Sequence, residues 1–513
     1  MKKTITLLLL LVSAFTFAQV QKLGELSSGK FLDSRIIYED TTDDVYGYFL
    51  LYQKDRISKE EFELEYVLLD KNLNKLTSNS FIAYKAKSVY SQVSLTFVKK
   101  IDSDLIIGIS DKIIGGSHTF NRRYRKLNLV DFTLSEEYVM VDHKIREKKY
   151  KQDETVKYND VVKNQRLIHT KGDYFVVFGK PEYNPIIAFG EVDEKIETSI
   201  KKILVLDKDF KVVKENKINQ NKAKRSSYDF YASDKDVFLL KKRKYKGRVI
   251  DHIDIYDYKN GFVAEFPLSD TEYKFYVDEA CFTENEIVLY VRLFRKKDKY
   301  LLSQKALGHA KIVLDKKTGK ELKKDYMLWA DLAPNIITKG KYGDIKKYGR
   351  IFVADFVHLE NGNSILIAEG FKTKKHSEIL DLFVIEVDAN LQIKYFKKIE
   401  KNKTVLKSVK ATGSYLKAVG ALDYLYSQKL DNDGNLVFFY ANNEKEGSRR
   451  AKRKNPEWVL GIITYVDGEF NYDKLQLSSK DSQIIPGKAK NGYIRLLEIE
   501  GEEIELRLEK INY

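Results

Sequence analysis

Hydrophobic and polar residues alternate with a period of two in many short runs along the chain. In residues 62–68 four apolar positions share one face and the residues between them the other, and residues 503–508 repeat this alternation. Such a pattern is typical of β-strands. Residues 58–66, SKEEFELEY, allow a local helix, but after the first 18 residues we find no long, capped helical period. The pattern predicts an all-β protein and disfavours an α/β fold.

A polar turn followed directly by an apolar strand recurs about every 50 to 80 residues, an interval typical of propeller repeats. Each of these turns contains an Asp or Asn. We expect each turn to precede the second strand of a repeat unit. The eight turn residues are Asp44, Asp104, Asp173, Asp236, Asn285, Asn363, Asn435 and Asn491.

A second recurring signal is an apolar strand that ends in a turn aspartate. An aspartate carboxylate can accept the backbone N–H two residues further on, and Gly319 can supply the positive φ of a three-residue hairpin loop. We interpret these aspartates as structural; the alternative is a row of metal or acid sites. They occur once in each of the first seven units, at Asp70, Asp131, Asp207, Asp257, Asp315, Asp388 and Asp467.

One more strand-like stretch, such as residues 227–233, separates neighbouring units, which gives four strands in each unit. Four-stranded antiparallel units at this spacing predict a β-propeller, in which each sheet packs against its neighbours around an axis. We expect seven or eight blades; the alternative is a set of tandem β-sandwiches. The predicted blade boundaries are 29–82, 83–141, 142–219, 220–269, 270–328, 329–400, 401–478, and 479–513 together with 19–28.

The last unit is one strand short, while residues 20–28, VQKLGELSS, precede the first strand of the first unit. We expect this N-terminal segment to supply the missing outer strand. The ring would then be closed, and no open sheet edge would remain at the junction.

Residues 1–18 have the features of a secretory signal peptide: two lysines, a short apolar run and a small-residue cleavage site. The apolar run is too short to span a bilayer, and no later stretch reaches about 18 apolar residues. We therefore expect cleavage after Ala18 and a periplasmic or secreted protein without a transmembrane segment; the alternative is a retained N-terminal anchor. The single cysteine, Cys281, excludes an internal disulfide, so buried area has to stabilise the fold.

Lysine and arginine outnumber the acidic residues 90 to 75, which gives a formal net charge of +15. In an antiparallel four-stranded blade, the connections between strands one and two and between strands three and four share one face, named here the turn face. The remaining connections share the opposite face, named here the rim face. Six blades have a basic cluster between strands two and three; the third has residues 191–197, EVDEKIE, there instead.

These clusters predict a basic rim face that binds an anionic polymer, surface or partner: an anionic glycan, lipopolysaccharide, extracellular DNA or an acidic protein. Such binding falls steeply with salt. The alternative is that the lysine-rich loops serve only to keep a β-rich protein in solution. The candidate anion-binding residues are Arg122, Arg123, Arg125, Lys242, Arg243, Lys244, Tyr245, Arg295, Lys296, Lys374, Lys375, Arg449, Arg450, Lys452, Arg453 and Lys454.

The sequence lacks the motifs of common catalytic sites, including G-x-S-x-G, H-E-x-x-H, C-x-x-C and the P-loop. Its seven histidines are scattered singly, and Cys281 lies in a strand-like run typical of a small buried hydrophobe. We therefore expect no cofactor and no metal site, and we favour a non-catalytic role.

Taken together, these patterns predict an exported binding or scaffolding protein. One alternative is a propeller enzyme that acts on polysaccharide, a glycoside hydrolase or lyase with two carboxylates at the central channel. Another is a structural envelope component that binds a protein partner and exposes an apolar patch.

Residues 46–76, YGYFLLYQKDRISKEEFELEYVLLDKNLNKL, together with the Ala18–Gln19 site and the single cysteine, resemble uncharacterised secreted β-propeller-like proteins of Gram-negative bacteria. The resemblance implies export and a repeat fold. It implies no activity, so no functional residue is carried over.

Overall fold

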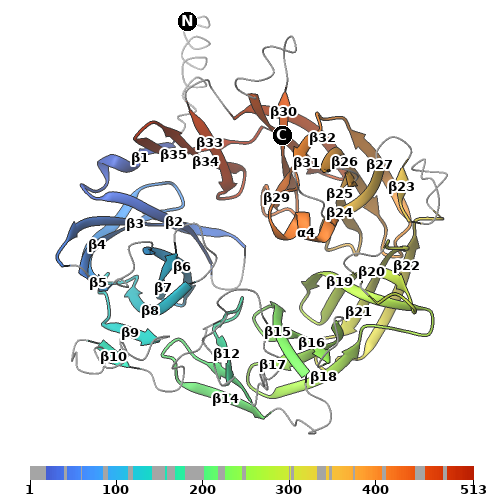
Figure 1. Ribbon diagram of the computed structural model, residues 1–513, viewed down its shortest axis with the longest axis horizontal. Helices are drawn as coiled ribbons and strands as arrows, with labels where there is room; N and C mark the ends of the chain where they lie inside the picture. Colours follow the sequence, from blue (N-terminus) through green and yellow to red (C-terminus); the bar gives the residue numbers. More distant parts are fainter. Residues whose placement is uncertain are drawn as a thin grey trace, which may run out of the picture.

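Eight β-sheets stand around a central axis in the computed structural model, and the chain passes through them in order (Figure 1). The predicted signal peptide, residues 1–18, lies outside the described residues. No helix in the described part of the chain is long and apolar enough to cross a membrane. The structure describes residues 19–39, 43–58, 61–84, 91–113, 119–140, 156–158, 168–179, 202–217, 226–244, 250–299, 301, 305–331, 342–345, 349–373, 376–406, 412–444, 457–477 and 482–512.

The sheets are named blades 1 to 8 in chain order, and their strands run antiparallel except for one added strand in blade 2. Blade 1 contains β2 (Lys30–Tyr38), β3 (Val45–Arg56), β4 (Glu61–Asp70) and β5 (Lys75–Tyr84). Blade 2 contains β6 (Ser91–Ile101), β7 (Asp104–Ile113), β8 (Thr119–Asn128), β9 (Glu137–Met140) and β10 (Val156–Tyr158). Blade 3 contains β11 (Ile168–His169), β12 (Phe175–Gly179), β13 (Lys202–Leu206) and β14 (Val212–Lys217). Blade 4 contains β15 (Ser226–Ser233), β16 (Val237–Lys244), β17 (Ile250–Asp257) and β18 (Gly261–Pro267).

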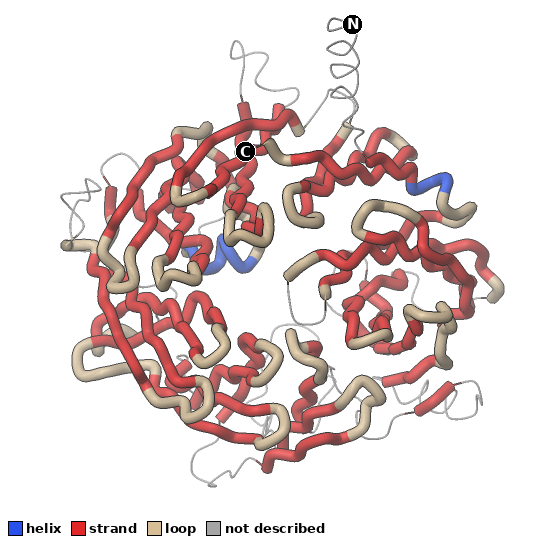
Figure 2. The backbone as a smooth tube through the Cα atoms, turned by 180° about the vertical axis from the view of Figure 1, so that it is seen from behind, coloured by secondary structure: helices blue, strands red, loops and turns tan. Residues whose placement is uncertain are grey.

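The second half of the ring has the same plan and includes a short helix inside the ring (Figures 1 and 2). Blade 5 contains β19 (Tyr273–Phe282), β20 (Glu286–Arg295), β21 (Gly308–Asp315) and β22 (Glu321–Leu328). Blade 6 contains β23 (Asp344–Ile345), β24 (Gly349–His358), β25 (Ser364–Thr373), β26 (Ser377–Val387), β27 (Ile393–Ile399) and β28 (Thr404–Leu406). Helix α4 (Gly413–Ala418) precedes blade 7, which contains β29 (Tyr424–Lys429), β30 (Leu436–Glu444), β31 (Glu457–Val466) and β32 (Glu469–Gln476). Blade 8 contains β33 (Gln483–Lys488), β34 (Tyr493–Glu500), β35 (Glu503–Lys510) and the N-terminal β1 (Gln19–Lys22), which a 3-10 helix, η1 (Leu23–Glu25), follows.

The N-terminal segment closes the ring, as the sequence predicts. Strand β1 is the outer strand of blade 8 and pairs antiparallel with β35, with Gln19 opposite Leu508. Just beyond β1, Leu23 is fully buried, and its carbonyl accepts a hydrogen bond from the Tyr52 hydroxyl of blade 1 at 2.9 Å. The two ends of the chain therefore meet in one sheet.

Three details differ from the sequence expectations. Blades 2 and 6 contain more than four strands, because β10 pairs with β9 in blade 2, while β23 and β28 pair with β24 and β26 in blade 6. Strand β26 is longer than β27, which pairs only with residues 382–387, and β28 covers the remaining residues 377–379. Residues 61–66 form part of β4 and are not helical.

The hydrophobic core is divided among the junctions between blades. One cluster at each junction joins side chains of two neighbouring blades, as Phe49 of blade 1 does with Leu105 of blade 2. Seven further junctions have equivalent clusters. Middle strands such as β20 are consequently buried on both faces, which explains why their sequences are almost continuously apolar.

The turn signals predicted from the sequence lie where we expect them. Each of the eight Asp and Asn residues of the first signal begins a strand or lies one or two residues before it, as Asp236 does before β16; the strands are β3, β7, β12, β16, β20, β25, β30 and β34. The carboxylate of Asp70 accepts the backbone N–H of Asn72 at 2.7 Å, and four other turn aspartates make the same bond to the residue two positions on. Asp315 accepts the backbone N–H of Thr318, three positions on. Asp467 differs, because it and Gly468 both have positive φ in a two-residue turn.

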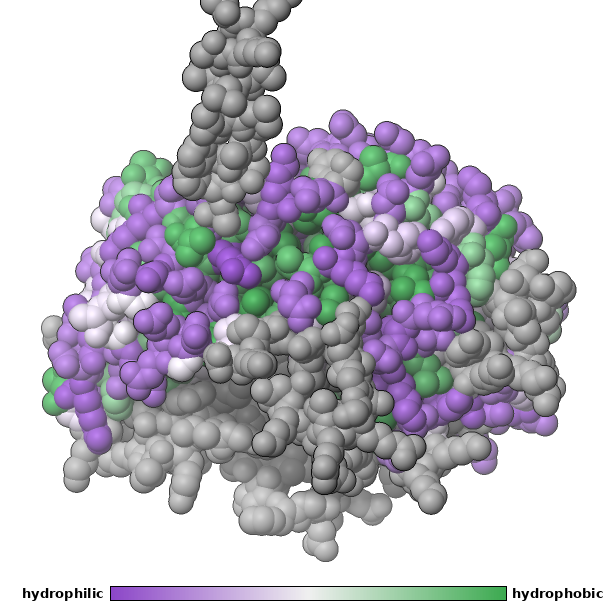
Figure 3. Space-filling model, turned by 90° about the horizontal axis from the view of Figure 1, so that it is seen from above, coloured by the Kyte–Doolittle hydropathy of each residue, from purple (hydrophilic) through white to green (hydrophobic). Residues whose placement is uncertain are grey.

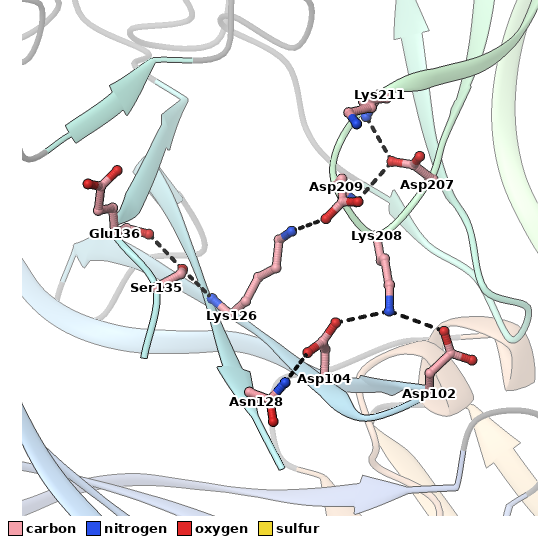
Figure 4. Close-up of polar contacts among 10 residues, drawn as sticks. All are labelled: Asp102, Asp104, Lys126, Asn128, Ser135, Glu136, Asp207, Lys208, Asp209 and Lys211. Carbon is pink, nitrogen blue, oxygen red and sulfur yellow. Dashed lines mark hydrogen bonds and ion pairs between the residues drawn. The ribbon is translucent and has the colours of Figure 1, made fainter. Parts of the chain in front are cut away.

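Lysines connect neighbouring blades at most junctions, and these residues are named here lysine latches. On the turn face, Lys208 of blade 3 points between Asp102 and Asp104 of blade 2, at 3.2 and 3.1 Å (Figure 4). The long lysine side chain can span a junction and reach a turn carboxylate or a backbone carbonyl. The other latches and their acceptors are Lys100 with Glu39, Lys99 with the Thr170 carbonyl, Lys316 with Asp234, Lys311 with the Gly362 carbonyl, Lys401 with Asp423, and Lys490 with Asn72.

The latch between blades 6 and 7 includes a buried acid. Glu369 on β25 is fully buried and accepts hydrogen bonds from the backbone N–H groups of Asp423, at 3.2 Å, and Tyr424. Burial raises the pKa of Glu369 to about 7; the charge of Lys401 opposes this shift and that of Asp423 adds to it. When Glu369 is protonated it carries no charge, and Lys401 and Asp423 then form an ion pair with zero net charge.

Lys316→Met tests the latch between blades 4 and 5. The Lys316 side chain is 4% exposed and lies 2.6 Å from Asp234, whose own side chain is 15% exposed. Removing the cation leaves that carboxylate without its partner, and we expect the free energy of unfolding in urea to fall by about 1–2 kcal/mol. Lys317→Met, at the exposed neighbouring position, is the matched control. Equal effects of the two substitutions would contradict a latch.

Glu369→Gln tests the buried acid. The folded pKa of Glu369 lies above its usual value of 4.5, so its stabilising contribution is present at low pH and is lost as the pH rises through about 7. Glutamine retains an oxygen for the backbone N–H groups and cannot ionise. We expect the unfolding free energy of the variant relative to the wild type to increase by up to about 3 kcal/mol between about pH 5 and pH 8. Denaturant titrations at both values check this; a difference independent of pH would refute it.

Candidate functional site

The loop between β20 and β21 lies on the rim face, and the structure describes its basic residues. Asp298 accepts hydrogen bonds from the backbone N–H of Arg295 at 3.1 Å and from its guanidinium at 3.0 Å. The Lys274 ammonium donates to the Asp298 carbonyl at 2.9 Å, which fixes the loop further. Arg295, a predicted anion-binding residue, is therefore already paired with a carboxylate. The neighbouring Lys296, also predicted, is exposed, as are Lys297 and Lys299.

Other predicted residues lie in strands and take part in internal contacts. Arg123 on β8 is fully buried, and Arg125 donates to the Ser135 carbonyl at 3.0 Å and lies 3.5 Å from Glu137. Lys242 on β16 forms an ion pair with Glu265. The sequence pattern predicts these basic runs in the connections between strands two and three. The structure instead places them in β8 and β16. Lysine and arginine can lie there because their aliphatic stems pack along the sheet.

Much of the predicted basic rim lies outside what the structure describes. The side chains of Arg122, Arg243 and Lys244 are not described, although their backbones belong to β8 and β16. The predicted residues that lie wholly outside the described ranges are Tyr245, Lys374, Lys375, Arg449, Arg450, Lys452, Arg453 and Lys454.

A second candidate site, which the sequence analysis could not locate, lies inside the ring beside α4 (Figure 2). Strand β19 of blade 5 contributes the carboxylates of Asp278 and Glu279, and strand β24 of blade 6 contributes that of Asp355. The Lys417 ammonium of α4 is 3.6 Å from Glu279. The Glu279 side chain is 38% exposed although burial raises its pKa, so it faces solvent while protein surrounds it on most sides. We name this group the channel acids.

Arg292 fixes both α4 and one of the channel acids. Its Nε donates to the two Asp278 oxygens at 3.0 and 2.7 Å, and its Nη2 donates to the Ser414 hydroxyl of α4 at 2.7 Å. The guanidinium also lies 4.7 Å from the centre of the Tyr276 ring. Asp355 is positioned separately, by hydrogen bonds from the hydroxyls of Tyr424 and Ser427.

Lys241 on β16 faces the channel acids from blade 4. Its ammonium lies 3.5 Å from the centre of the Tyr231 ring and 5.5 Å from that of Tyr276. Burial lowers the pKa of Lys241 to about 8, and the charges of Asp278 and Glu279 oppose this shift. The Glu279 carboxyl has a raised pKa and lies beside a second carboxylate, and Lys241 has a pKa of about 8. Groups with such pKa values can donate and accept protons near neutral pH.

The remaining nucleophilic and metal-ligating groups have structural surroundings. Among the described residues, no group of three or more His, Cys, Asp or Glu side chains is placed to hold a metal ion. His309 is buried, and its ring centre lies 5.4 Å from that of Trp329; burial lowers its pKa to about 3. Cys281 is only partly buried, contrary to the sequence expectation, and burial raises its thiol pKa to about 12, which keeps it protonated and unreactive.

The family model described as "Family of unknown function (DUF6770)" matches residues 1–380 and 375–512. The chain belongs to this family. No curated protein matches the chain. The family thus adds no activity to the assignment of a β-propeller fold.

Three solved structures with a similar fold are compared with the chain, and one of them is a β-propeller domain. The β-propeller domain of the Trilobed protease from Pyrococcus furiosus has 12% sequence identity and a TM-score of 0.34, with 82% of this chain and 96% of that chain covered. The polysaccharide lyase Uly1 has 11% identity and a TM-score of 0.40, with 81% and 89% covered. One of two analysed prolyl endopeptidases has 9% identity and a TM-score of 0.35, with 92% and 55% covered, so the chain spans about half of its length. These likenesses concern the fold alone.

Glu279→Gln tests the electrostatics of the channel acids. Glu279 is one of the negative charges that hold up the pKa of Lys241. Its neutralisation should lower that pKa further below about 8, because only burial and the remaining acids then act on the ammonium. NMR titration of labelled lysine measures the change, with Glu265→Gln as a control because Glu265 pairs with Lys242 instead. A Lys241 pKa that stays unchanged in Glu279→Gln would contradict the arrangement.

Proposed function

We propose that this protein is an exported, non-catalytic binding or scaffolding protein whose rim face binds an anionic polymer, surface or acidic partner. Export is inferred from the N-terminal sequence. The observation that carries the binding proposal is a group of exposed cations on one rim loop. Lys296, Lys297 and Lys299 extend into solvent from a loop whose backbone is fixed by Asp298.

Several exposed cations on one fixed loop suit a ligand with repeated negative charges. Each cation that approaches a charged group of a polymer releases condensed counterions, which favours binding and makes it sensitive to salt. The ligands that fit this chemistry are an anionic glycan, lipopolysaccharide, extracellular DNA and an acidic protein. The neighbouring Arg295 is neutralised by Asp298 and serves to shape the loop.

A charge-matched pair of triple variants tests this proposal. One variant changes Lys296, Lys297 and Lys299 to glutamine; its control changes the exposed turn-face residues Lys259, Lys317 and Lys320. Binding to a sulfated glycan, lipopolysaccharide, duplex DNA and an acidic protein is measured over a range of salt concentrations. For DNA, the rim variant should lose up to about three units of salt slope, about one for each lysine, and the control none.

Two results would overturn the proposal. Equal losses in both variants would mean that net charge alone matters, in which case the rim lysines serve solubility. Failure of the wild type to bind any of the four ligands at low salt would remove the proposed role altogether.

A second candidate is a propeller enzyme that acts on polysaccharide at the channel acids. It is favoured by the raised pKa of Glu279 beside Asp355 and by Lys241 with its pKa of about 8. Cleavage of acidic polysaccharides by the wild type, abolished in Glu279→Gln, would replace the binding proposal with this one.

The third role considered from the sequence, a structural envelope component, requires an apolar docking surface. On the side of the molecule that lies at the top of Figure 1, the coloured hydrophobic residues lie in several patches, each bordered by hydrophilic residues (Figure 3).

A further inference from the structure

Arg495 is a cation inside the ring that differs from the rim lysines and the lysine latches. It lies on β34 directly opposite Gly487 of the innermost strand β33. A side chain at Gly487 would place its Cβ 2.5 Å from Nη2 and 2.9 Å from Nε of Arg495. Because Gly487 has no side chain, the guanidinium of Arg495 can lie over the inner strand.

Tyrosines from two neighbouring blades surround this guanidinium. Its central carbon lies 5.8 Å from the centre of the Tyr48 ring of blade 1. Tyr426, on the innermost strand of blade 7, and Tyr38, at the end of β2, are close enough for their pKa values to respond to its charge. Blades 7 and 8 are joined here by a hydrogen bond from the Gln428 side chain to the Tyr493 carbonyl at 2.6 Å.

Three polar atoms of this group are buried without a hydrogen-bond partner among the described residues. They are Nε of Arg495 and the hydroxyl oxygens of Tyr48 and Tyr426. Buried polar groups in native proteins are normally paired, because an unpaired group forfeits its bonds with water. Arg495, Tyr38 and Tyr426 are only partly buried as whole residues, so solvent reaches part of the group, whereas Tyr48 is fully buried.

Every one of these groups is a hydrogen-bond donor at neutral pH. Burial raises the pKa of Tyr38, Tyr48 and Tyr426 above the usual value of 10, so all three stay protonated. Burial lowers the pKa of Arg495 below its usual value, but arginine retains its charge at neutral pH. A guanidinium with phenolic O–H groups around it matches an acceptor that carries negative charge and several oxygens.

The nearby charges also favour an anion. The acid that acts on Tyr38 is Asp43, which forms an ion pair with Lys171 at 3.1 Å. The pKa of Asp43 is lowered, although burial opposes this, by Lys171, Lys488 and Lys429. Three lysines therefore surround one carboxylate beside the tyrosines, and the local potential stays positive.

We propose that Arg495, Tyr38, Tyr48 and Tyr426 form a binding site inside the ring for one oxyanion: a sulfate, phosphate or carboxylate group. Arg495 supplies the charge, and the hydroxyls of Tyr48 and Tyr426 donate to the oxygens of the ligand. The group is either a free ion or a substituent of a larger molecule. This site is separate from the rim loop of blade 5 and does not depend on the proposed binding there.

Titration calorimetry in a chloride buffer tests the site. Sodium sulfate, sodium phosphate and sodium glucuronate test binding of a free ion, and a sulfated oligosaccharide tests binding of an oxyanion that is a substituent of a larger molecule.

Tyr426→Phe removes only the unpartnered hydroxyl and leaves the ring, so folding should be unaffected. A hydrogen bond to a charged group contributes about 1.5–3 kcal/mol, so the affinity should fall about tenfold or more. Tyr66→Phe is the matched control, because its hydroxyl is equally buried and unpartnered within the described residues, in the core between blades 1 and 2.

Each outcome bears on the site alone. Saturable binding of a free ion that Tyr426→Phe weakens and Tyr66→Phe does not establishes a site for small oxyanions. The same pattern with the oligosaccharide alone establishes recognition of an attached group. The proposal is overturned if no probe shows saturable binding, or if Tyr426→Phe and Arg495→Gln both bind with the affinity of the wild type. The rim variant of Lys296, Lys297 and Lys299 should bind sulfate as the wild type does, so failure of the rim proposal is distinguishable from failure of this one.

Discussion

Each blade of this ring has two apolar faces, and neither is buried until another blade packs against it. The core is accordingly divided among eight junctions, each of which joins the side chains of two neighbours. An open ring would leave two of these faces exposed to water. The pairing of β1 with β35 prevents this by placing both ends of the chain in blade 8. Every other feature of the molecule depends on that closure.

The same constraint explains part of the basic composition. A junction buries apolar side chains, but the turns at its edge expose carboxylates and carbonyls that belong to two different blades. Lysine can span the distance with an apolar stem and bind at the far side, as Lys316 and Lys208 do. Many positive charges on the turn face are thereby neutralised within the fold. Among the described cations that no such bridge neutralises are the exposed lysines on the rim loop of blade 5 and the half-buried Arg495, and these are available to a ligand.

The sequence predicts the architecture well because the turns repeat. An Asp or Asn before each second strand and an aspartate that accepts the backbone N–H two residues on are local features, readable without knowledge of the partners of a strand. The spare segment at residues 20–28 identifies the closing strand for the same reason, through a count of strands.

The sites could not be predicted in this way, because they depend on contacts across strands and blades. Arg123 and Arg295 look alike in a basic run, yet one is fully buried and the other is paired with Asp298 at the surface. The position of Gly487 opposite Arg495 follows from the register of β33 and β34, which the sequence does not reveal. The channel acids come from strands of two different blades, so no spacing along the chain singles them out.

The most direct test of this division between structural and ligand-facing cations is a map of lysine reactivity. The folded protein is treated with an amine-reactive reagent, with and without an acidic glycan, and each lysine is quantified by mass spectrometry. The account predicts that Lys99, Lys311, Lys316 and Lys401 react slowly in both states. It also predicts that Lys296, Lys297 and Lys299 react rapidly and become protected by the glycan. Latch lysines that react as fast as the rim lysines, or glycan protection confined to the turn face, would contradict it.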